Sequence, residues 1–163
     1  SSNGINRLNA EKSWMNLAKS KDLQLQIFRL SGIYSNEKNI LARIKSGKAK
    51  IINKKNHFFS RIHVEDIANI LFKSLQQFKS KEIYNISDDK PAPSDEVASY
   101  GSKLLGMKIP QTVDLHSIEN VTLKNFYKDS KKVSNKKMKF FFEYSLMYPS
   151  YIEGLNQIRD DYV

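Results

Sequence analysis

The chain has 163 residues, no cysteine and a formal net charge of +10 at pH 7. That length suits one domain with a single hydrophobic core, so we expect residues 1–163 to fold as one unit. The lack of cysteine excludes a disulfide framework, a cysteine nucleophile and a thiolate metal site, and it fits a cytoplasmic protein. No apolar run approaches the ~20 residues that a membrane-spanning helix needs, so we expect no membrane insertion.

The positive charge comes mainly from lysine, with 22 lysines against 5 arginines. We interpret the excess as a solvated surface, because surfaces that bind phosphates use more arginine and interleave aromatic residues. The stretch that most favours a nucleic-acid-binding surface instead is residues 124–139. It holds seven lysines, one acidic residue and the aromatic residues Phe126 and Tyr127. A basic nucleic-acid-binding module therefore stays as a minor alternative, and it predicts an affinity that falls steeply with salt.

The first half of the chain predicts helices and short strands in alternation. Residues 5–20 are expected to form a helix whose apolar face consists of Ala10, Trp14, Leu17 and Ala18. Residues 23–30 alternate and then become apolar, as in a strand that enters a covered sheet. The next expected elements are a loop at 31–36, a short helix at 39–45 ended by Gly47, a strand at 49–52 and an extended piece at 58–62.

The second half continues the alternation. A helix is expected at 64–78, where an apolar stripe repeats at helical spacing and the acidic pair Glu65/Asp66 favours the helix start. A strand at 82–87 precedes a helix that opens at Asp95, with Ser94 as its N-cap, and stops at Gly106. Residues 108–134 predict mostly loop with one or two short helices, and helices at 134–142 and 150–160 close the chain. The fold class is therefore α/β, with a partial Rossmann-like parallel sheet and flanking helices.

Five segments of the chain occur in the order and spacing of a known family. Residues 28–34 (FRLSGIY) resemble its segment Leu-Arg-Leu-Phe-Asn-Val-Tyr, and residues 61–68 (RIHVEDIA) resemble its segment Phe-Ile-His-Val-Asp-Asp-Val-Ala. The other three are residues 3–11, 84–94 and 129–155, which resemble the end of the catalytic helix, the Tyr-Asn-Val-Gly strand and the closing Asp-x-Ser-Lys to Gly-Leu region. The chain thereby resembles the C-terminal half of an atypical extended short-chain dehydrogenase, of the NAD-dependent epimerase/dehydratase family.

This resemblance implies a partial Rossmann-like sheet joined to the family's small, mostly helical substrate-binding region, with NAD(P) as cofactor. None of the six glycines of the chain has the spacing of the glycine-rich fingerprint that binds the pyrophosphate. By the resemblance, that fingerprint belongs to an N-terminal half that this sequence lacks. We therefore expect the chain to supply the nicotinamide side and the substrate wall, and not to bind NAD tightly by itself.

The departures from the family concern its chemistry. Asn3 stands where the resemblance places the catalytic Tyr, and Arg7 where it places the Lys. An asparagine cannot exchange a proton near neutral pH, so the general acid–base role is lost at that position and the catalytic residues are unknown. Gly32 stands where the family commonly has an Asn that contacts a sugar-nucleotide phosphate, so the small-molecule substrate is also unknown.

The candidate site residues form two sets. The resemblance gives as cofactor-binding residues Arg7, Ser31, Gly32 and Ile33, of which the last three follow the carboxyl end of a strand, where open α/β sheets bind ligands. The substrate-binding candidates are Arg61, His63, Tyr34 and Asn39.

Arg61 and His63 alternate on an extended piece and should face one side, with Arg61 binding an anionic group and His63 orienting it. Structural alternatives stay open: His63 can bond backbone at the helix start, and Arg61 can pair with Glu65 or Asp88.

Other polar groups predict ordinary structural roles. Glu65 and Asp66 are interpreted as helix-start residues, and Asp88 and Asp89 as part of a turn. The three histidines show no spacing typical of metal ligands, so no metal site is expected.

Three hypotheses follow. The first is the substrate-side part of an NAD(P)-dependent epimerase/dehydratase-like oxidoreductase. The second is a catalytically silent NAD(P)- or metabolite-binding protein of the same fold, and the third is the nucleic-acid-binding module. Because half of the family's sheet is missing, we also expect an uncovered strand edge or apolar face, which a second copy of the chain would cover.

Overall fold

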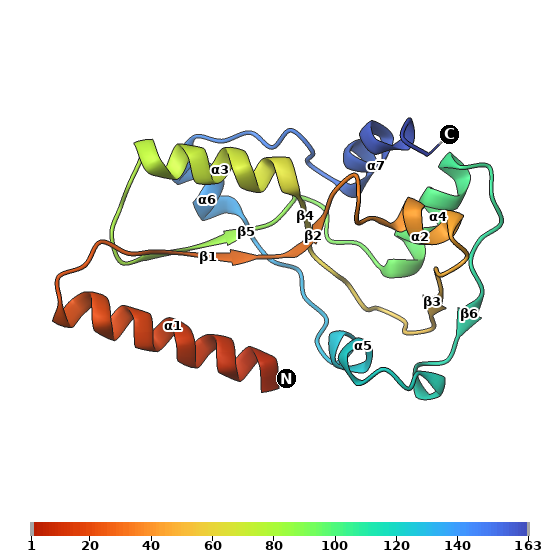
Figure 1. Ribbon diagram of the computed structural model, residues 1–163, viewed down its shortest axis with the longest axis horizontal. Coiled ribbons are helices and arrows are strands. Elements are labelled where there is room, and N and C mark those ends of the chain that lie inside the picture. Colours follow the sequence, from red (N-terminus) through yellow and green to blue (C-terminus); the bar gives the residue numbers. More distant parts are fainter. Residues whose placement is uncertain (1, 163) are drawn as a thin grey trace.

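The computed structural model describes residues 2–162 (Figure 1). Its helices are α1 (Ser2–Ser20), α2 (Ile40–Lys45), α3 (Val64–Gln76), α4 (Ser94–Leu104), the 3-10 helix η1 (Leu115–Ser117), α5 (Val121–Phe126), α6 (Lys136–Phe142) and α7 (Tyr151–Arg159). Its strands are β1 (Gln26–Leu30), β2 (Gly32–Tyr34), β3 (Ile51–Ile52), β4 (Arg61–His63), β5 (Glu82–Ile86) and β6 (Thr112–Val113). The predicted α/β class is confirmed.

The strands form three parallel pairs, β1 with β5, β2 with β4, and β3 with β6. β2 continues β1 in the chain, and the partner changes at Ser31. The Ser31 amide donates to Ile86 O of β5 at 3.0 Å, whereas the next amide, that of Gly32, donates to Ser60 O just before β4 at 3.0 Å. Beyond β5, the Asp88 amide donates to Arg61 O at 2.7 Å. The carboxyl ends of β2, β4 and β5 therefore meet in one place.

Two hydrophobic cores hold this arrangement. In the first, α3 and α6 pack on β5, as expected from the apolar stripe of α3; its members are Ile62, Ile67, Ile70, Tyr84, Ile86, Met138, Phe142 and Tyr144. In the second, α2, α4 and α7 pack together at the other end of the molecule; its members are Leu41, Ala92, Val97, Tyr151, Leu155 and Ile158. The place where β2, β4 and β5 end lies between these cores (Figure 1).

The long N-terminal helix runs antiparallel to β1 along one side of it (Figure 1). Its predicted apolar face is largely uncovered, since Trp14 is 58% exposed and only Ala18 is buried among the described residues of α1. Among the described residues, a two-bond ion pair links it to β1, in which Arg29 Nε and Nη2 of β1 donate to the Glu11 carboxylate at 2.9 and 2.6 Å. This pair lowers the pKa of Glu11 below its usual value.

Two local predictions were wrong. Residues 32–34 were expected to lie in a loop but form β2, because the extended backbone there gains a partner in β4 that local sequence does not reveal. The N-cap of α4 is Pro93, which makes no side-chain capping bond, and not Ser94. The Ser94 hydroxyl instead lies 2.9 Å from the hydroxyl of Tyr127.

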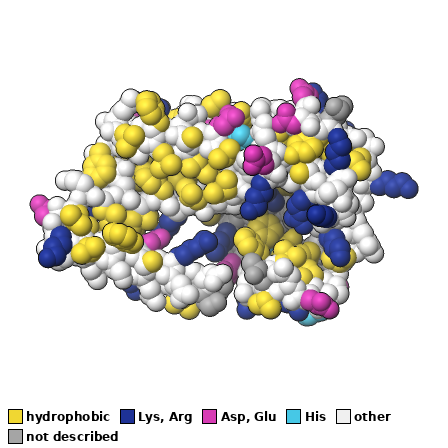
Figure 2. All heavy atoms as spheres, viewed as in Figure 1, with side chains coloured by type: hydrophobic (Ala, Val, Ile, Leu, Met, Phe, Trp, Pro, Cys, Tyr) yellow, Lys and Arg dark blue, Asp and Glu magenta, His cyan; other side chains and the backbone are white. Residues whose placement is uncertain are grey.

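The outer face of α3 and its surroundings is apolar and exposed, and Figure 2 shows yellow side chains gathered over this helix. The exposed apolar residues of α3 and just beyond it are Val64, Leu71, Phe72, Leu75 and Phe78, and the exposed Met147 lies against Asn69 of this helix. The expected apolar face is thus present, whereas a second copy covering it stays a prediction. Within residues 2–162 no helix combines the length and apolar character of a membrane span.

Candidate functional site

The candidate site is built from the carboxyl ends of β2, β4 and β5, which bring Tyr34, Arg61 and Asp88 together. Strand ends of parallel sheets collect such side chains because the loops that follow them diverge and leave a crevice. Of the four predicted substrate residues, Arg61, His63 and Tyr34 lie here, on paired strands: Gly32 is opposite Arg61 and Tyr34 is opposite His63.

Arg61 is the main cation of the site. Its Nη1 donates to Phe59 O at 3.1 Å and to Ala92 O at 2.9 Å, which fixes the guanidinium plane against two backbone carbonyls. Burial lowers the pKa of Arg61, although the nearby carboxyl group of Asp88 acts in the opposite direction. The two side chains form no direct ion pair among the described residues. Only one of its three nitrogens is used by these bonds, so donors remain for an anionic ligand.

Tyr34 fills the space beside Arg61 because Gly154 of α7 leaves room for it. The Tyr34 hydroxyl donates to Ser150 O at 3.4 Å, and a Cβ built on Gly154 would lie 2.1 Å from that hydroxyl. Burial, followed by the charges of Asp88 and Asp66, raises the pKa of Tyr34 well above its usual value. Tyr34 is therefore a neutral hydroxyl at the site, and it cannot act as a base near neutral pH.

Replacing Gly154 by Ala should destabilise the protein by about 2 kcal/mol, because the new methyl group must displace the buried Tyr34 ring. Chemical denaturation of the two proteins measures the difference. Combining Gly154→Ala with Tyr34→Phe removes the hydroxyl nearest to the new methyl group and should restore part of the loss. Equal stability of Gly154→Ala and the unmodified protein would contradict the tight contact.

Asp88 was predicted to belong to a turn, but it is buried at 1% exposure beside Arg61. Neither of its carboxylate oxygens has a hydrogen-bond partner among the described residues, although the amides of Lys90 and Arg61 lie near enough to favour its charged form. Burial outweighs Arg61 and raises the pKa of Asp88 to about 7. A buried aspartate beside a buried arginine is the signal that sequence reasoning missed, since two aspartates after a strand also fit an ordinary turn.

His63 follows the structural alternative, which is confirmed. Its Nδ1 accepts a bond from the Glu65 amide at 3.3 Å, so His63 caps α3. The ring is fully buried between Tyr34 and Tyr148, at centroid distances of 5.0 and 4.0 Å. Burial lowers its pKa, so the imidazole is neutral and supports the site rather than carrying charge there.

Asn39 is the fourth predicted substrate residue and lies apart, at the start of α2. Its Oδ1 accepts from the Ala42 amide at 2.9 Å, and its Nδ2 donates to Ser35 O, Asn36 O and the Tyr162 hydroxyl. All of its hydrogen-bonding groups thus have partners within the chain. Its substrate role stays a prediction that the geometry does not favour.

The predicted cofactor residues lie near the same strand ends. Ser31 is half-buried, whereas Gly32 and Ile33 are exposed, with Ile33 at 49%. Arg7 is exposed on α1, one helical turn before Glu11; because Glu11 pairs with Arg29 of β1, Arg7 lies toward the carboxyl end of that strand. Their cofactor-binding role stays a prediction.

The pyrophosphate side is different. The described glycines with positive φ, Gly47 and Gly106, follow the ends of α2 and α4, and neither joins a strand to a helix N-terminus. Residues 2–162 therefore offer no glycine-rich cradle for a pyrophosphate.

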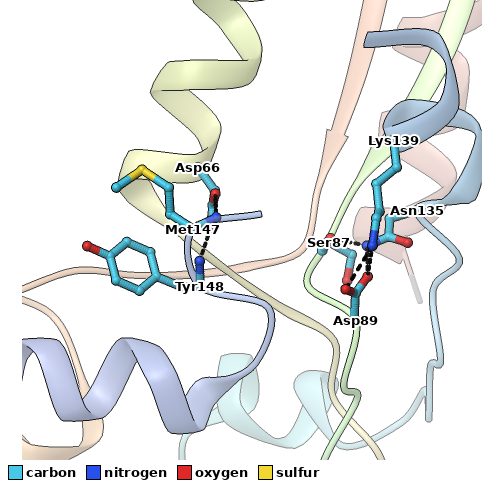
Figure 3. A network of polar contacts seen from close by, with 7 residues as sticks. All are labelled: Asp66, Ser87, Asp89, Asn135, Lys139, Met147 and Tyr148. Atoms are coloured by element: carbon cyan, nitrogen blue, oxygen red, sulfur yellow. Dashed lines mark hydrogen bonds and ion pairs between the residues drawn. The ribbon is translucent and has the colours of Figure 1, made fainter. Parts of the chain in front are cut away.

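Two polar networks anchor the segments around the site (Figure 3). At the start of α3, the fully buried Asp66 accepts from the amides of Met147 and Tyr148, at 2.8 and 3.1 Å, and from the Tyr144 hydroxyl at 2.8 Å. This is more than the helix-start role predicted for Asp66. It ties the segment between α6 and α7 to the strand ends.

The second network lies beyond β5 (Figure 3). Asn135 donates to Ser87 O at 2.8 Å and to Asp89 at 2.7 Å, and Lys139 pairs with Asp89 at 2.9 Å. Burial would raise the pKa of Asp89, but the bonds from Asn135 and Lys139 outweigh it and hold that pKa below its usual value. The two neighbouring aspartates thus differ. Asp89 is charged and pairs with Lys139, whereas Asp88 forms no ion pair among the described residues.

The lysine-rich stretch contributes to this packing. Lys137 pairs with Glu82 at 2.6 Å, Lys139 pairs with Asp89, and the Lys132 ammonium lies 3.9 Å from the ring centre of Phe58. Several of these lysines therefore interact with groups of the chain itself and are not free to bind a nucleic acid. Within residues 2–162, no three His, Asp or Glu side chains gather in a way that could hold a metal ion.

Comparisons with known proteins come from solved structures, since no protein-family model and no curated protein matches the chain. A functionally unknown conserved protein from Silicibacter pomeroyi is 33% identical, with a TM-score of 0.91 over 99% of this chain and 56% of that one. The UDP-glucose 4-epimerase of Thermotoga maritima, solved with UDP-glucose, is 15% identical, with a TM-score of 0.78 over 96% of this chain and 52% of that one. A human epimerase family protein solved with NADPH is 17% identical, with a TM-score of 0.72 over 85% of this chain and 49% of that one.

The chain therefore spans about half the length of these structures. Below 25% identity the likeness concerns the fold, and the more similar protein has no known function. Over this length, the chain has the Rossmann-like α/β fold of epimerases and dehydratases, several of whose structures were solved with NAD or NADPH.

Proposed function

We propose that the chain forms the substrate-side part of an NAD(P)-dependent oxidoreductase of the extended short-chain dehydrogenase, or epimerase/dehydratase, family. The observation that carries this proposal is the meeting of Arg61, Tyr34 and Asp88 at the carboxyl ends of three parallel strands. Polar side chains that converge at this edge of an open α/β sheet are typical of a ligand site. The likeness of fold to NAD(P)-containing epimerases and dehydratases supports the same assignment.

Each residue has a role that follows from its surroundings. Arg61 is held by two carbonyls and binds an anionic group of the substrate with its remaining donors. Tyr34 offers a neutral hydroxyl beside it, and His63 holds the Tyr34 ring in place from the start of α3. Arg7, Ser31, Gly32 and Ile33 border the nicotinamide end, where NAD(P) supplies hydride chemistry when bound.

A catalytically silent binding protein of the same fold is the second candidate. It is favoured by Asn3 and Arg7, which are both exposed on α1, at the positions that the family resemblance assigns to the proton donor and its lysine. An asparagine cannot donate a proton near neutral pH, so the site would bind a ligand without running the family's reaction.

Replacing Arg61 by Ala in the natural protein that carries this chain should weaken binding of an anionic substrate at least tenfold, because a desolvated guanidinium–anion contact is lost. UDP-glucose serves as the probe, with binding measured by calorimetry. Arg43→Ala, which removes an exposed arginine, is the matched control and should leave the affinity unchanged. An unchanged affinity in Arg61→Ala, with the fold intact by circular dichroism, would remove Arg61 from the site.

The cofactor is tested separately by the quenching of NADH or NADPH fluorescence on the same natural protein. Binding together with oxidation of the reduced cofactor by a panel of aldehydes and ketones supports the oxidoreductase. Binding without turnover supports the silent protein. Absence of binding to either nucleotide would overturn the oxidoreductase and leave, of the silent candidates, only a metabolite-binding protein.

A further inference from the structure

The charge of the chain is unevenly distributed along its length. The chain holds 27 basic and 17 acidic residues, and residues 38–64 and 97–113 contain ten of the basic residues and none of the acidic ones. The remainder therefore holds 17 of each kind, so the whole net charge of +10 belongs to these two segments. A lysine excess spread evenly over a solvated surface does not produce such a pattern.

The fold brings the two basic segments together at one end of the molecule. Gly101 of α4 leaves room for α2, since a Cβ built there would lie 3.1 Å from the side chains of Leu41 and Ile44. β3 pairs with β6, and the Ile51 amide donates to Gln111 O at 3.0 Å. Figure 2 shows dark blue side chains at the right of the view, where Figure 1 places α2, α4 and β3.

An open hollow lies in this basic region, between the ends of α2 and α4. Its volume is about 410 Å³, within the range of ligand-binding sites. Met107 on its lining is 43% exposed, and Ile109, which lies between two lining residues, is 61% exposed. The hollow thus combines accessible apolar surface with positive charge; its lining includes Ile44, Ala49, Met107 and Pro110, with Lys50 and Lys108.

The walls of the hollow are held by bonds within the chain. After α2, the Ala49 amide donates to Arg43 O at 2.9 Å. After α4, the Met107 amide donates to Ser102 O at 2.9 Å, and the Ser102 hydroxyl donates to Lys108 O at 3.3 Å. A site formed in advance in this way loses little conformational entropy when a partner binds.

The lysines beside the hollow are not neutralised. Lys48, Lys50 and Lys108 are exposed and form no ion pair among the described residues. Lys45 and Lys103 lie in the last turns of α2 and α4, where they offset the helix dipoles. The other three lie beyond those turns, so the dipoles do not account for them.

The surroundings of the hollow decide among the partners that carry negative charge. A second copy of this end would bring like charges together. Nucleic acids are bound by aromatic side chains and arginine, and the described lining of the hollow has neither. Membrane-binding helices project their apolar side chains outward, whereas here the apolar side chains line a hollow. A short acidic peptide segment with an apolar side chain fits both the shape and the charge.

We propose that this hollow docks an acidic segment of another protein, with an apolar side chain in the hollow and carboxylates on Lys50 and Lys108. Removal of the apolar side chain from water stabilises the complex, and the charges orient the segment and speed its association.

The docking site is separate from the proposed substrate site. α4 has 11 residues and is therefore ~16 Å long, and it starts close to Ala92, which accepts a bond from Arg61, and ends at the hollow. The inference thus goes beyond the proposed function and does not rest on it.

The experiment measures fluorescence anisotropy on the natural protein that carries this chain. The probe is a short fluorescein-labelled peptide of glutamates with two leucines at its centre. In two matched peptides, serines replace the leucines or lysines replace the glutamates. The test variant is Lys50→Glu with Lys108→Glu, and the control is Lys12→Glu with Lys19→Glu, which changes the net charge equally at exposed positions of α1.

We expect the Lys50→Glu/Lys108→Glu change to weaken binding of the leucine peptide at least tenfold, and the control change to weaken it less than twofold. The serine peptide should bind the unmodified protein at least fivefold more weakly than the leucine peptide, and the lysine peptide should not bind. Circular dichroism checks the fold of each variant. Lys50→Gln with Lys108→Gln removes the charges without reversing them and should weaken binding at least threefold.

Four outcomes would overturn the proposal. The leucine peptide does not bind, the test and control variants lose affinity equally, or the serine peptide binds as tightly as the leucine peptide. In the fourth, single-stranded DNA or phosphatidylserine vesicles bind more tightly than the leucine peptide and lose this binding in Lys50→Glu/Lys108→Glu, which would assign the surface to nucleic acid or to a membrane. The peptide measurements contain no cofactor or substrate, so their result is separate from that of the proposed function.

Discussion

Replacing Asp66 by Ala should destabilise the protein by about 4 kcal/mol, the largest loss that we expect from a single side chain of this region. The carboxylate accepts bonds from the Tyr144 hydroxyl and from the amides of Met147 and Tyr148. Without it, three donors at a buried position lose their acceptor, and the segment between α6 and α7 is released from α3. Urea denaturation followed by circular dichroism measures the change.

Glu65→Ala is the matched control for this prediction. Both residues lie in the first turn of α3, so both changes remove the same favourable interaction with the helix dipole. Among the described residues, the Glu65 carboxylate accepts one bond, from the Tyr148 hydroxyl at 2.7 Å, and that bond is only partly buried. The control should therefore cost about 1 kcal/mol. Equal losses in the two variants would mean that Asp66 acts as a helix-start residue and not as an anchor.

The second large effect is a fall in stability as the pH rises from 4 to 7. The pKa of Asp88 is raised from its ordinary value of 3.8 to about 7 in the folded protein. Between these values the folded state holds a proton that the unfolded state has lost, so the free energy of unfolding decreases with pH and levels off above 7. The full difference is of the order of 4 kcal/mol.

Asp88→Asn isolates this contribution, because its side chain has the same shape and does not titrate. The buried His57 and His63 act in the opposite direction, since burial lowers their pKa and their stabilising effect is lost as the pH falls below 6.5. The quantity to measure is therefore the difference between the two proteins in urea midpoints from pH 4.5 to 7.5. A difference that does not vary with pH would place the pKa of Asp88 in the ordinary range.

The helices could be predicted because their signals are local. The apolar stripe of residues 64–78 and the stop at Gly47 depend on neighbours within a few residues, and α3 and α2 lie where they were expected. β2 could not be predicted, because three residues are too few to show the alternating hydrophobic pattern of a strand. These residues form a strand because they pair with β4, almost thirty residues away.

The site was predictable in part for the same reason. Arg61 and Tyr34 stood out through their place beside strands, and the capping role of His63 was among the alternatives. The roles of Asp66 and Asp88 were missed because each has an adequate local explanation, a helix start and a turn. What separates them is that Asp66 accepts hydrogen bonds from partners about 80 residues away, whereas among the described residues no such distant donor bonds the buried Asp88 carboxyl group.

The attachment of α1 is loose. Among the described residues, this helix is held to the sheet by the exposed Glu11–Arg29 ion pair and by its buried end at Ala18. Such a helix opens locally at a low cost in free energy. Under the proposed function, the placement of Arg7 at the nicotinamide end would therefore depend on what packs against the open face of α1.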